Sequence, residues 1–423
     1  MRVLPRRPLP RPPIRRFLPT RHVLTRLLGP DREGAIQSLG ALGIMSVTSV
    51  IAGLILGLNE DRLGEFPGLL LLVPGAVALR GNIFGGVGSR LGTSIHAGTY
   101  RFSLRTTSVV GQNVIASILL TLELSIVLAT LAKLFAVVFG VENAISLADF
   151  LVISVLGGLV ASIVVLGFAL LLAAGSVRYD WDPDNVTAPL LTAAGDVVTL
   201  PTILLAAGVV DHPGIAGGLA SGMVVITIAL SVLVWRLRRR EIRTILIESI
   251  PILLIAGLVD LFAGLTVEGQ RSAFTEVPAV WVLLPGFLAV AGALGGILSS
   301  RLSSKLHLGF FDPRPLPPRE ARSDMLATFG LALPAFVLLA LFAQVAAHTA
   351  DLSGAHVARI VLAAVIGGVL ATVLVVAIAY YGTIVVVRFG LDPDTYGIPM
   401  VTSTLDLLGV FVFVLAVRAV GVI

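Results

Sequence analysis

The stretch PGAVALRGNIFGGVGSRL at residues 74–91 returns in altered form as PGFLAVAGALGGILSSRL at residues 285–302. The Pro-Gly opening, the Ser-Arg-Leu ending and two internal glycines keep their places, and the second stretch follows the first by 211 residues (74 to 285). Each stretch is apolar and long enough to lie within a membrane helix. This regularity predicts that one structural unit occurs twice in the chain.

A second pair of matching segments lies further along each unit. Both contain a DPD motif followed, at the same spacing, by a proline, a threonine and an aspartate, and the offset between them is now 210 residues (182 to 392). The matching residues are Asp182, Asp184, Pro189, Thr192 and Asp196 in the first unit, and Asp392, Asp394, Pro399, Thr402 and Asp406 in the second. The offset between matching residues changes only once, from 211 to 210, between the two pairs of segments. Such regularity favours duplication over chance.

The composition is that of a membrane protein. Of the 423 residues, 56% are hydrophobic and only 13% charged, and the mean hydropathy is +0.99. Apolar runs of about 20 residues recur along the chain, and such runs cross the bilayer as helices because lipid cannot satisfy backbone polar groups. We therefore expect an all-α polytopic membrane protein whose main partner is the lipid bilayer. The absence of cysteine excludes disulfides and thiolate chemistry.

Eleven transmembrane helices are predicted. They lie at about 34–58, 66–89, 108–140, 147–175, 186–210, 214–235, 244–266, 277–300, 325–347, 355–386 and 397–419. With the N-terminus in the cytosol, most of the 30 basic residues fall on the cytosolic side and the opposite loops are short and often acidic. The net charge of +5 therefore reflects membrane topology, and we expect no nucleic-acid partner. The C-terminus is then extracellular, and the expected location is the plasma or inner cell membrane.

The repeat divides the chain into four parts. Residues 1–33 form an Arg/Pro-rich cytosolic tail, 34–210 the first membrane unit, 211–243 a linking transmembrane helix with a basic loop, and 244–423 the second unit. Five spans per unit would invert directly joined copies, and the extra sixth span restores the orientation. We therefore expect two parallel five-helix repeats, related by an axis along the membrane normal, that work as a single-chain pseudo-dimer.

Asp196 and Asp406 are the main candidate ion-site residues. Each lies ~18 Å along its helix from the DPD motif, at 1.5 Å per residue, which places both near the bilayer midplane. An aspartate there costs at least about 2.5 kcal/mol on insertion scales, so it should face an ion, a partner or a cavity. Thr192 and Thr402 precede the aspartates by four residues and add neutral oxygen donors on the same helix faces. The alternative is a pair of neutral carboxylic acids, hydrogen-bonded between helices.

The four DPD carboxylates have two interpretations. Aspartates at a helix start satisfy free amide groups and complement the helix dipole. At the cytosolic ends of two repeated helices, they also give a pore a negative mouth that collects cations. The residues concerned are Asp182, Asp184, Asp392 and Asp394.

Arg80 and Glu123 break the equivalence of the two units. Their counterparts are Ala291 and Pro334, so both charges are specific to the first unit. Arg80 lies inside a predicted span and needs a counter-charge, for which Glu123 in the next span is the candidate.

On these motifs the chain resembles the MgtE-type magnesium transporters, in the duplicated form of the eukaryotic solute carriers and their archaeal relatives. The resemblance rests on the Pro-Gly…Ser-Arg-Leu stretch and the DPD…Pro…Thr…Asp run of each unit. It implies that Asp196 and Asp406 form the central ion site. Bacterial members carry one unit per chain and a cytosolic CBS sensor, whereas this chain has two units and no sensor.

The function expected is a channel or transporter for divalent cations, most of all Mg²⁺, which is cargo and not a cofactor. Mg²⁺ prefers oxygen ligands and keeps several waters, so one or two carboxylates suffice. Na⁺- or H⁺-coupled exchange of the same ion is an alternative. An intramembrane aspartyl protease is a remote one, because Tyr179-Asp180 and Gly195-Asp196 only partly match the YD and GxGD motifs. We therefore expect no enzyme activity.

Overall fold

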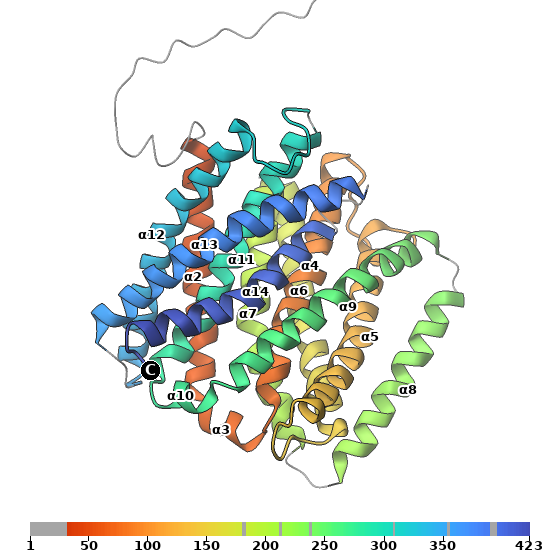
Figure 1. The fold of residues 1–423 in the computed structure, drawn as a ribbon. Coiled ribbons are helices and arrows are strands. Elements are labelled where there is room, and N and C mark those ends of the chain that lie inside the picture. Colours follow the sequence, from red (N-terminus) through yellow and green to blue (C-terminus); the bar gives the residue numbers. More distant parts are fainter. Residues whose placement is uncertain are drawn as a thin grey trace, which may run out of the picture.

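The structure, a computed structural model, describes residues 32–179, 183–210, 214–236, 239–307, 309–352, 356–389 and 396–423. The regular elements in these ranges are all helices, so the all-α prediction is confirmed (Figure 1). They are α2 (Arg32–Leu58), α3 (Glu60–Glu65), α4 (Leu69–His96), α5 (Val109–Val138), α6 (Leu147–Tyr179), α7 (Pro183–Val210), α8 (Ile215–Arg236), α9 (Arg240–Glu268), α10 (Arg271–Thr275), α11 (Ala279–His307), α12 (Arg319–Thr349), α13 (Val357–Arg388) and α14 (Ile398–Ala419).

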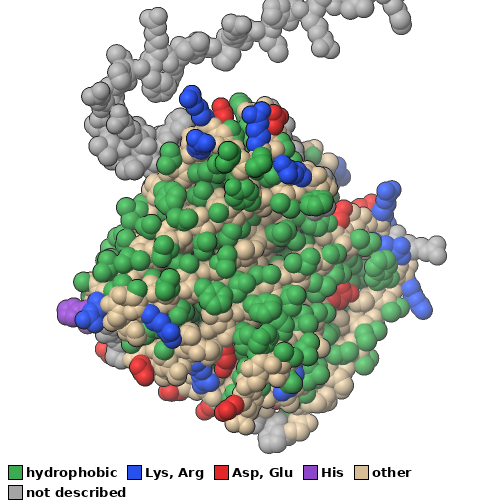
Figure 2. Space-filling view, viewed as in Figure 1, with side chains coloured by type: hydrophobic (Ala, Val, Ile, Leu, Met, Phe, Trp, Pro, Cys, Tyr) green, Lys and Arg blue, Asp and Glu red, His purple; other side chains and the backbone are tan. Residues whose placement is uncertain are grey.

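The eleven predicted spans correspond to eleven long helices. All except the short α3 and α10 contain a segment long and apolar enough to cross a membrane. On the face drawn in Figure 2, apolar side chains cover the middle of the molecule, and charged side chains gather towards its ends. This distribution suits a protein whose middle lies in hydrocarbon and whose ends reach water.

The second long helix of each half ends in the same way. We call α2–α7 the first half and α9–α14 the second half. Gly98 follows α4 with φ +67° and Gly309 follows α11 with φ +73°, and the two are equivalent in the repeat. Their amides donate to the carbonyls of Ile95 and Leu306, both at 3.0 Å. Glycine is favoured there because other residues rarely adopt the left-handed conformation that ends a helix.

The first long helix of each half packs against the other half. α2 packs on α11 and α12, and α9 packs in the same manner on α4 and α5. Figure 1 shows α2 beside α12, at the far side of the molecule from α5. Each of these helices also contacts the last long helix of its own half, α7 for α2 and α14 for α9. The two halves are therefore interlocked by an exchange of helices.

Two equivalent glycines permit this exchange. A Cβ atom on Gly53 of α2 would collide with the carbonyl group of Val282 in α11, and a Cβ on Gly264 of α9 would collide with that of Leu71 in α4. Helices in lipid gain little from apolar burial against one another, so close backbone approach at small residues supplies much of their association. At one end of the same α2–α11 pair, Arg301 donates to the hydroxyl of Ser38 at 3.3 Å.

The extra helix, α8, stands at one edge of the bundle beside α5 and α6 (Figure 1). Only 17% of its most apolar segment is buried, the lowest share among the candidate spans. Its position agrees with a linking role and leaves most of its surface to lipid.

The glycine contacts predict a large effect of one methyl group. Gly53→Ala and Gly264→Ala should each destabilise the protein by about 1–3 kcal/mol, because the rigid backbone of the facing helix cannot move away from the new atom. Thermal unfolding of the purified protein in detergent measures the effect. Gly43→Ala is the matched control. Gly43 lies on the same helix as Gly53, but a Cβ added there meets no atom within 4 Å. Equal melting temperatures for the three variants would contradict the prediction.

Candidate ion site

Asp196 lies near the middle of α7, deep inside the bundle. Its side chain is 8% exposed. The hydroxyl of Ser49, from α2 of the same half, donates to its Oδ2 at 3.4 Å. A carboxylate at this depth has lost most of its water and keeps one weak donor in exchange, which leaves it poised to bind a cation.

Asp406 lies at the equivalent depth of α14 and is half-buried. Its carboxylate lies within electrostatic range of Asp196. The two aspartates that the repeat singled out are thus near one another although they belong to different halves. Like charges in a medium of low dielectric constant repel strongly, so a cation between them would be bound favourably.

A third carboxylate, which the sequence analysis did not single out, belongs to the same centre. Asp260 of α9 is 1% exposed and lies within electrostatic range of Asp406. Its Oδ2 accepts a hydrogen bond from Ser403 of α14 at 3.2 Å, whereas its Oδ1 is buried without a hydrogen-bond partner. The sequence signal was present, because a carboxylate inside an apolar span is itself unusual.

Thr192 and Thr402 lie where α7 and α14 face the second long helices. A Cβ on Gly81 of α4 would be 3.6 Å from the methyl group of Thr192, and one on Gly292 of α11 would be 3.9 Å from that of Thr402. The hydroxyl of Thr402 donates to the carbonyl of Ile398 at 3.0 Å. Its oxygen keeps a lone pair that can accept from water or contact a cation.

A partly exposed stripe runs along α4, and an equivalent one along α11. These two helices bury a larger share of their apolar segments than the other candidate spans, so the partial exposure of one face is unusual. A Cβ on Gly85 or on Gly296 would meet nothing within 4 Å. The α4 stripe comprises Pro74, Ala78, Asn82, Gly85 and Ser89; the α11 stripe comprises Pro285, Ala289, Ala293, Gly296 and Ser300.

The carboxylates do not form a tight metal site. In the part of the chain that the structure describes, no three acidic or histidine side chains converge closely enough to hold a bare metal ion. Mg²⁺ sheds its water reluctantly and is commonly held through that water. Carboxylates spaced more widely than direct ligands therefore suit a hydrated ion.

The DPD motifs fall largely outside the described residues. This applies to Asp182, Asp392 and Asp394, while Asp184 lies in the first turn of α7. Both interpretations of these carboxylates, helix capping and a negative pore mouth, remain predictions.

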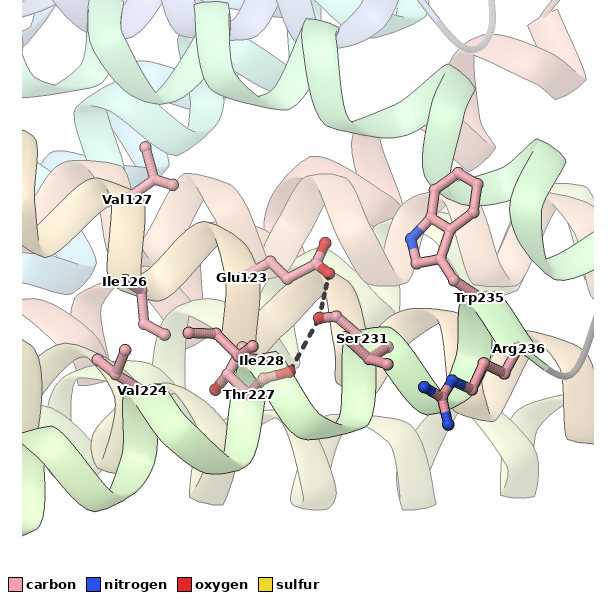
Figure 3. Close-up of a pocket in the computed structure, with 10 residues that line it drawn as sticks. Glu123, Ile126, Val127, Val224, Thr227, Ile228, Ser231, Trp235 and Arg236 are labelled. Carbon is pink, nitrogen blue, oxygen red and sulfur yellow. Dashed lines mark hydrogen bonds between the residues drawn. The ribbon is translucent and has the colours of Figure 1, made fainter.

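The predicted charge pair between Arg80 and Glu123 is wrong. Glu123 accepts a hydrogen bond from the hydroxyl of Ser231 in α8 at 2.6 Å, at the edge of a cavity of about 590 Å³ between α5 and α8 (Figure 3). Arg80 is completely buried and donates from Nη2 to Ser125 of α5 at 3.1 Å. Its Nε and Nη1 have no hydrogen-bond partner. The extra helix, not Arg80, therefore provides the polar partner of Glu123.

The space around Arg80 is filled differently in the second half. The Arg80 guanidinium and the Ser125 hydroxyl lie against Gly158 of α6, where a Cβ would collide with both. At the equivalent Gly368 of α13, the neighbouring atoms belong to the ring of Phe336. Phe336 is the counterpart of Ser125, and Ala291 that of Arg80. A long and a short side chain have thus exchanged places between the halves.

In the part of the chain that the structure describes, eleven candidate membrane helices surround buried carboxylates, which is the pattern of polytopic membrane proteins with an ion pathway. Residues 73–206 and 284–416 each match the MgtE family, which is described as a family of divalent cation transporters. The chain belongs to this family, with its characteristic region present twice.

Three similar proteins match the chain over most of its length. The chain is 25% identical to solute carrier family 41 member 2 of Xenopus laevis over 89% of its own length and 70% of that protein. It is 24% identical to the member 2 protein of Homo sapiens over 89% of its length and 68% of that protein. It is 25% identical to solute carrier family 41 member 3 of Mus musculus over 81% and 73%. No solved structure matches the chain significantly.

The exchange around Gly158 and Gly368 predicts a non-additive pair of substitutions. Ser125→Phe alone should destabilise the protein by about 1–3 kcal/mol, because the ring would enter space that Arg80 fills. Adding Arg80→Ala copies the pair found in the second half and should restore most of the loss. Thermal unfolding in detergent measures both variants. A double variant less stable than Ser125→Phe would contradict the prediction.

Proposed function

We propose that this protein transports Mg²⁺ across the cell membrane through the interface of its two halves, with Asp196 and Asp406 as the central ion site. The single chain then acts as a pseudo-dimer. Its N-terminus lies in the cytosol and its C-terminus outside, in keeping with the distribution of basic residues.

The observation that carries the proposal is the pair of equivalent aspartates inside the bundle. Asp196 and Asp406 come from different halves, lie at equivalent depths and interact electrostatically within the bundle. Mutual repulsion makes such a pair unfavourable unless a cation neutralises it. Threonine hydroxyls from Thr192 and Thr402 add the neutral oxygens that can hold the water shell of Mg²⁺.

The route to this site is proposed to follow the α4 and α11 stripes. Both stripes run along the helix from the proline end towards Arg90 or Arg301, which the positive-inside rule assigns to the cytosol. The small residues at Gly85 and Gly296 leave open space beside the backbone. The DPD motifs, at the cytosolic ends of the helices that carry the aspartates, would make the entrance negative.

The reciprocal packing supports a two-fold relation between residues 34–210 and 244–423. Contacts of α2 with α11 and α12 recur as contacts of α9 with α4 and α5. Any two-fold axis between the halves generates such an exchange, and we place this axis along the membrane normal because a sixth crossing between two five-helix copies gives them the same orientation. The extra helix α8, within residues 211–243, supplies the additional crossing.

The test is Mg²⁺ flux into proteoliposomes that contain the purified protein. Asp196→Asn and Asp406→Asn should each reduce flux about tenfold or more, and the double variant should abolish it, because the site loses its charge. Asp312→Asn is the control, since that carboxylate is exposed and pairs with Arg314. Undiminished flux in the double variant would refute the central site.

The same vesicles distinguish a channel from a coupled exchanger. A channel needs only the electrochemical gradient of Mg²⁺ itself, whereas coupled exchange also needs Na⁺ or H⁺ moving in the opposite direction. Flux that persists without either gradient and rises with the potential supports the channel.

A further inference from the structure

The first and second halves present different side chains to their buried aspartates. Ser49 of α2 and Asp260 of α9 are equivalent in the repeat, since they are 211 residues apart. Ser49 donates a hydrogen bond to Asp196 at 3.4 Å. Asp260 lies within electrostatic range of Asp406, the counterpart of Asp196. One position therefore holds a neutral donor in the first half and a second negative charge in the second.

The surroundings of Asp260 satisfy only part of its carboxylate. Ser403 donates to Oδ2 at 3.2 Å, and the residue equivalent to Ser403 in the first half is Ala193. The Cβ of Asp260 lies against Gly75, in the Pro-Gly motif of α4. Its Oδ1 is buried and has no hydrogen-bond partner. Such an oxygen is costly in a membrane interior unless a ligand compensates it.

A cation is the ligand that fits this position. Asp260 and Asp406 repel one another, and a positive charge beside both converts the repulsion into attraction. Among the described residues, no basic side chain bonds to either carboxylate. Asp406, which is half-buried, interacts electrostatically with both Asp196 and Asp260.

We propose that Asp260 is a third carboxylate of the transport site, which holds the divalent cation off the pseudo-two-fold axis and closer to the second half. This inference rests on the proposed function and deepens it. Four positions then face the ion. Asp196, Asp406 and Asp260 supply up to three negative charges, and Ser49 occupies the fourth position. A monovalent cation leaves more of this charge uncompensated than a divalent one, so Asp260 also favours divalent ions.

Binding and transport both test the role of Asp260. The measurements are Mg²⁺-dependent thermal stabilisation of the purified protein in detergent and the concentration dependence of Mg²⁺ flux in proteoliposomes. Asp260→Asn should raise the half-saturating Mg²⁺ concentration about tenfold in both, since it keeps the size of the side chain and removes the charge. Melting temperature without Mg²⁺ shows whether the variant folds like the parent protein.

Two further variants separate charge from packing. Ser403→Ala removes the hydrogen bond to Asp260 but keeps its charge, and it should change half-saturation by less than about threefold. The double variant Ser49→Asp/Asp260→Ser moves the third carboxylate to the equivalent position in the first half. It should bind Mg²⁺ more tightly than Asp260→Ser alone.

The outcomes separate this inference from the proposed function. Unchanged half-saturation in Asp260→Asn, with flux lost in the Asp196→Asn/Asp406→Asn variant, overturns the role of Asp260 and leaves the central pair in place. A Ser403→Ala defect as large as that of Asp260→Asn also overturns it, because packing then explains the effect. Full flux in the Asp196→Asn/Asp406→Asn variant refutes the proposed function itself.

Discussion

The close approach of two pairs of helices holds the structure together. Gly53 brings α2 against the backbone of α11, and Gly264 brings α9 against that of α4. In lipid, the hydrophobic effect does not drive helices together as it does in water. Van der Waals contact at such points is therefore a main source of stability. Because each contact joins opposite halves, neither half has a complete set of helix partners without the other. The same two helices also contact α7 and α14, which brings Ser49 to Asp196 and Asp260 to Ser403.

The centre of the bundle is distinguished by its buried negative groups. Three carboxylates from α7, α9 and α14 lie where the dielectric constant is low, and in the described ranges serine hydroxyls are the hydrogen-bond donors to Asp196 and Asp260. An arrangement built for stability alone would replace these groups with apolar side chains of similar size. Their cost is understandable if the ion that passes through supplies the missing charge. Arg80 is a buried cation, but its guanidinium lies on the α5–α6 side of α4, where it contacts Ser125 and Gly158 and not the carboxylates.

Much of the architecture could be predicted from the sequence. Apolar runs are direct signals of membrane helices, and the repeat offset identified which helices are equivalent. The offset does not say which half a helix packs against, so the exchange of α2 and α9 was not predictable from it. Asp196 and Asp406 are recognisable in the sequence because the repeat pairs two acids, whereas Asp260 is not, because its counterpart is Ser49. The Arg80–Glu123 pair was inferred from charge alone, without knowledge of helix faces, and the structure gives Glu123 a partner in α8 instead.

The exchanged helices have a consequence for how the protein is made. Synthesis runs from the N-terminus, and domains normally fold in that order as they emerge. Here α2 is made well before α11, because Val282, the residue that Gly53 meets, is added only after about 230 more residues. Until then, the glycine face of α2 must remain in lipid or against a temporary neighbour. The membrane insertion machinery therefore handles an open bundle that closes only when the second half arrives.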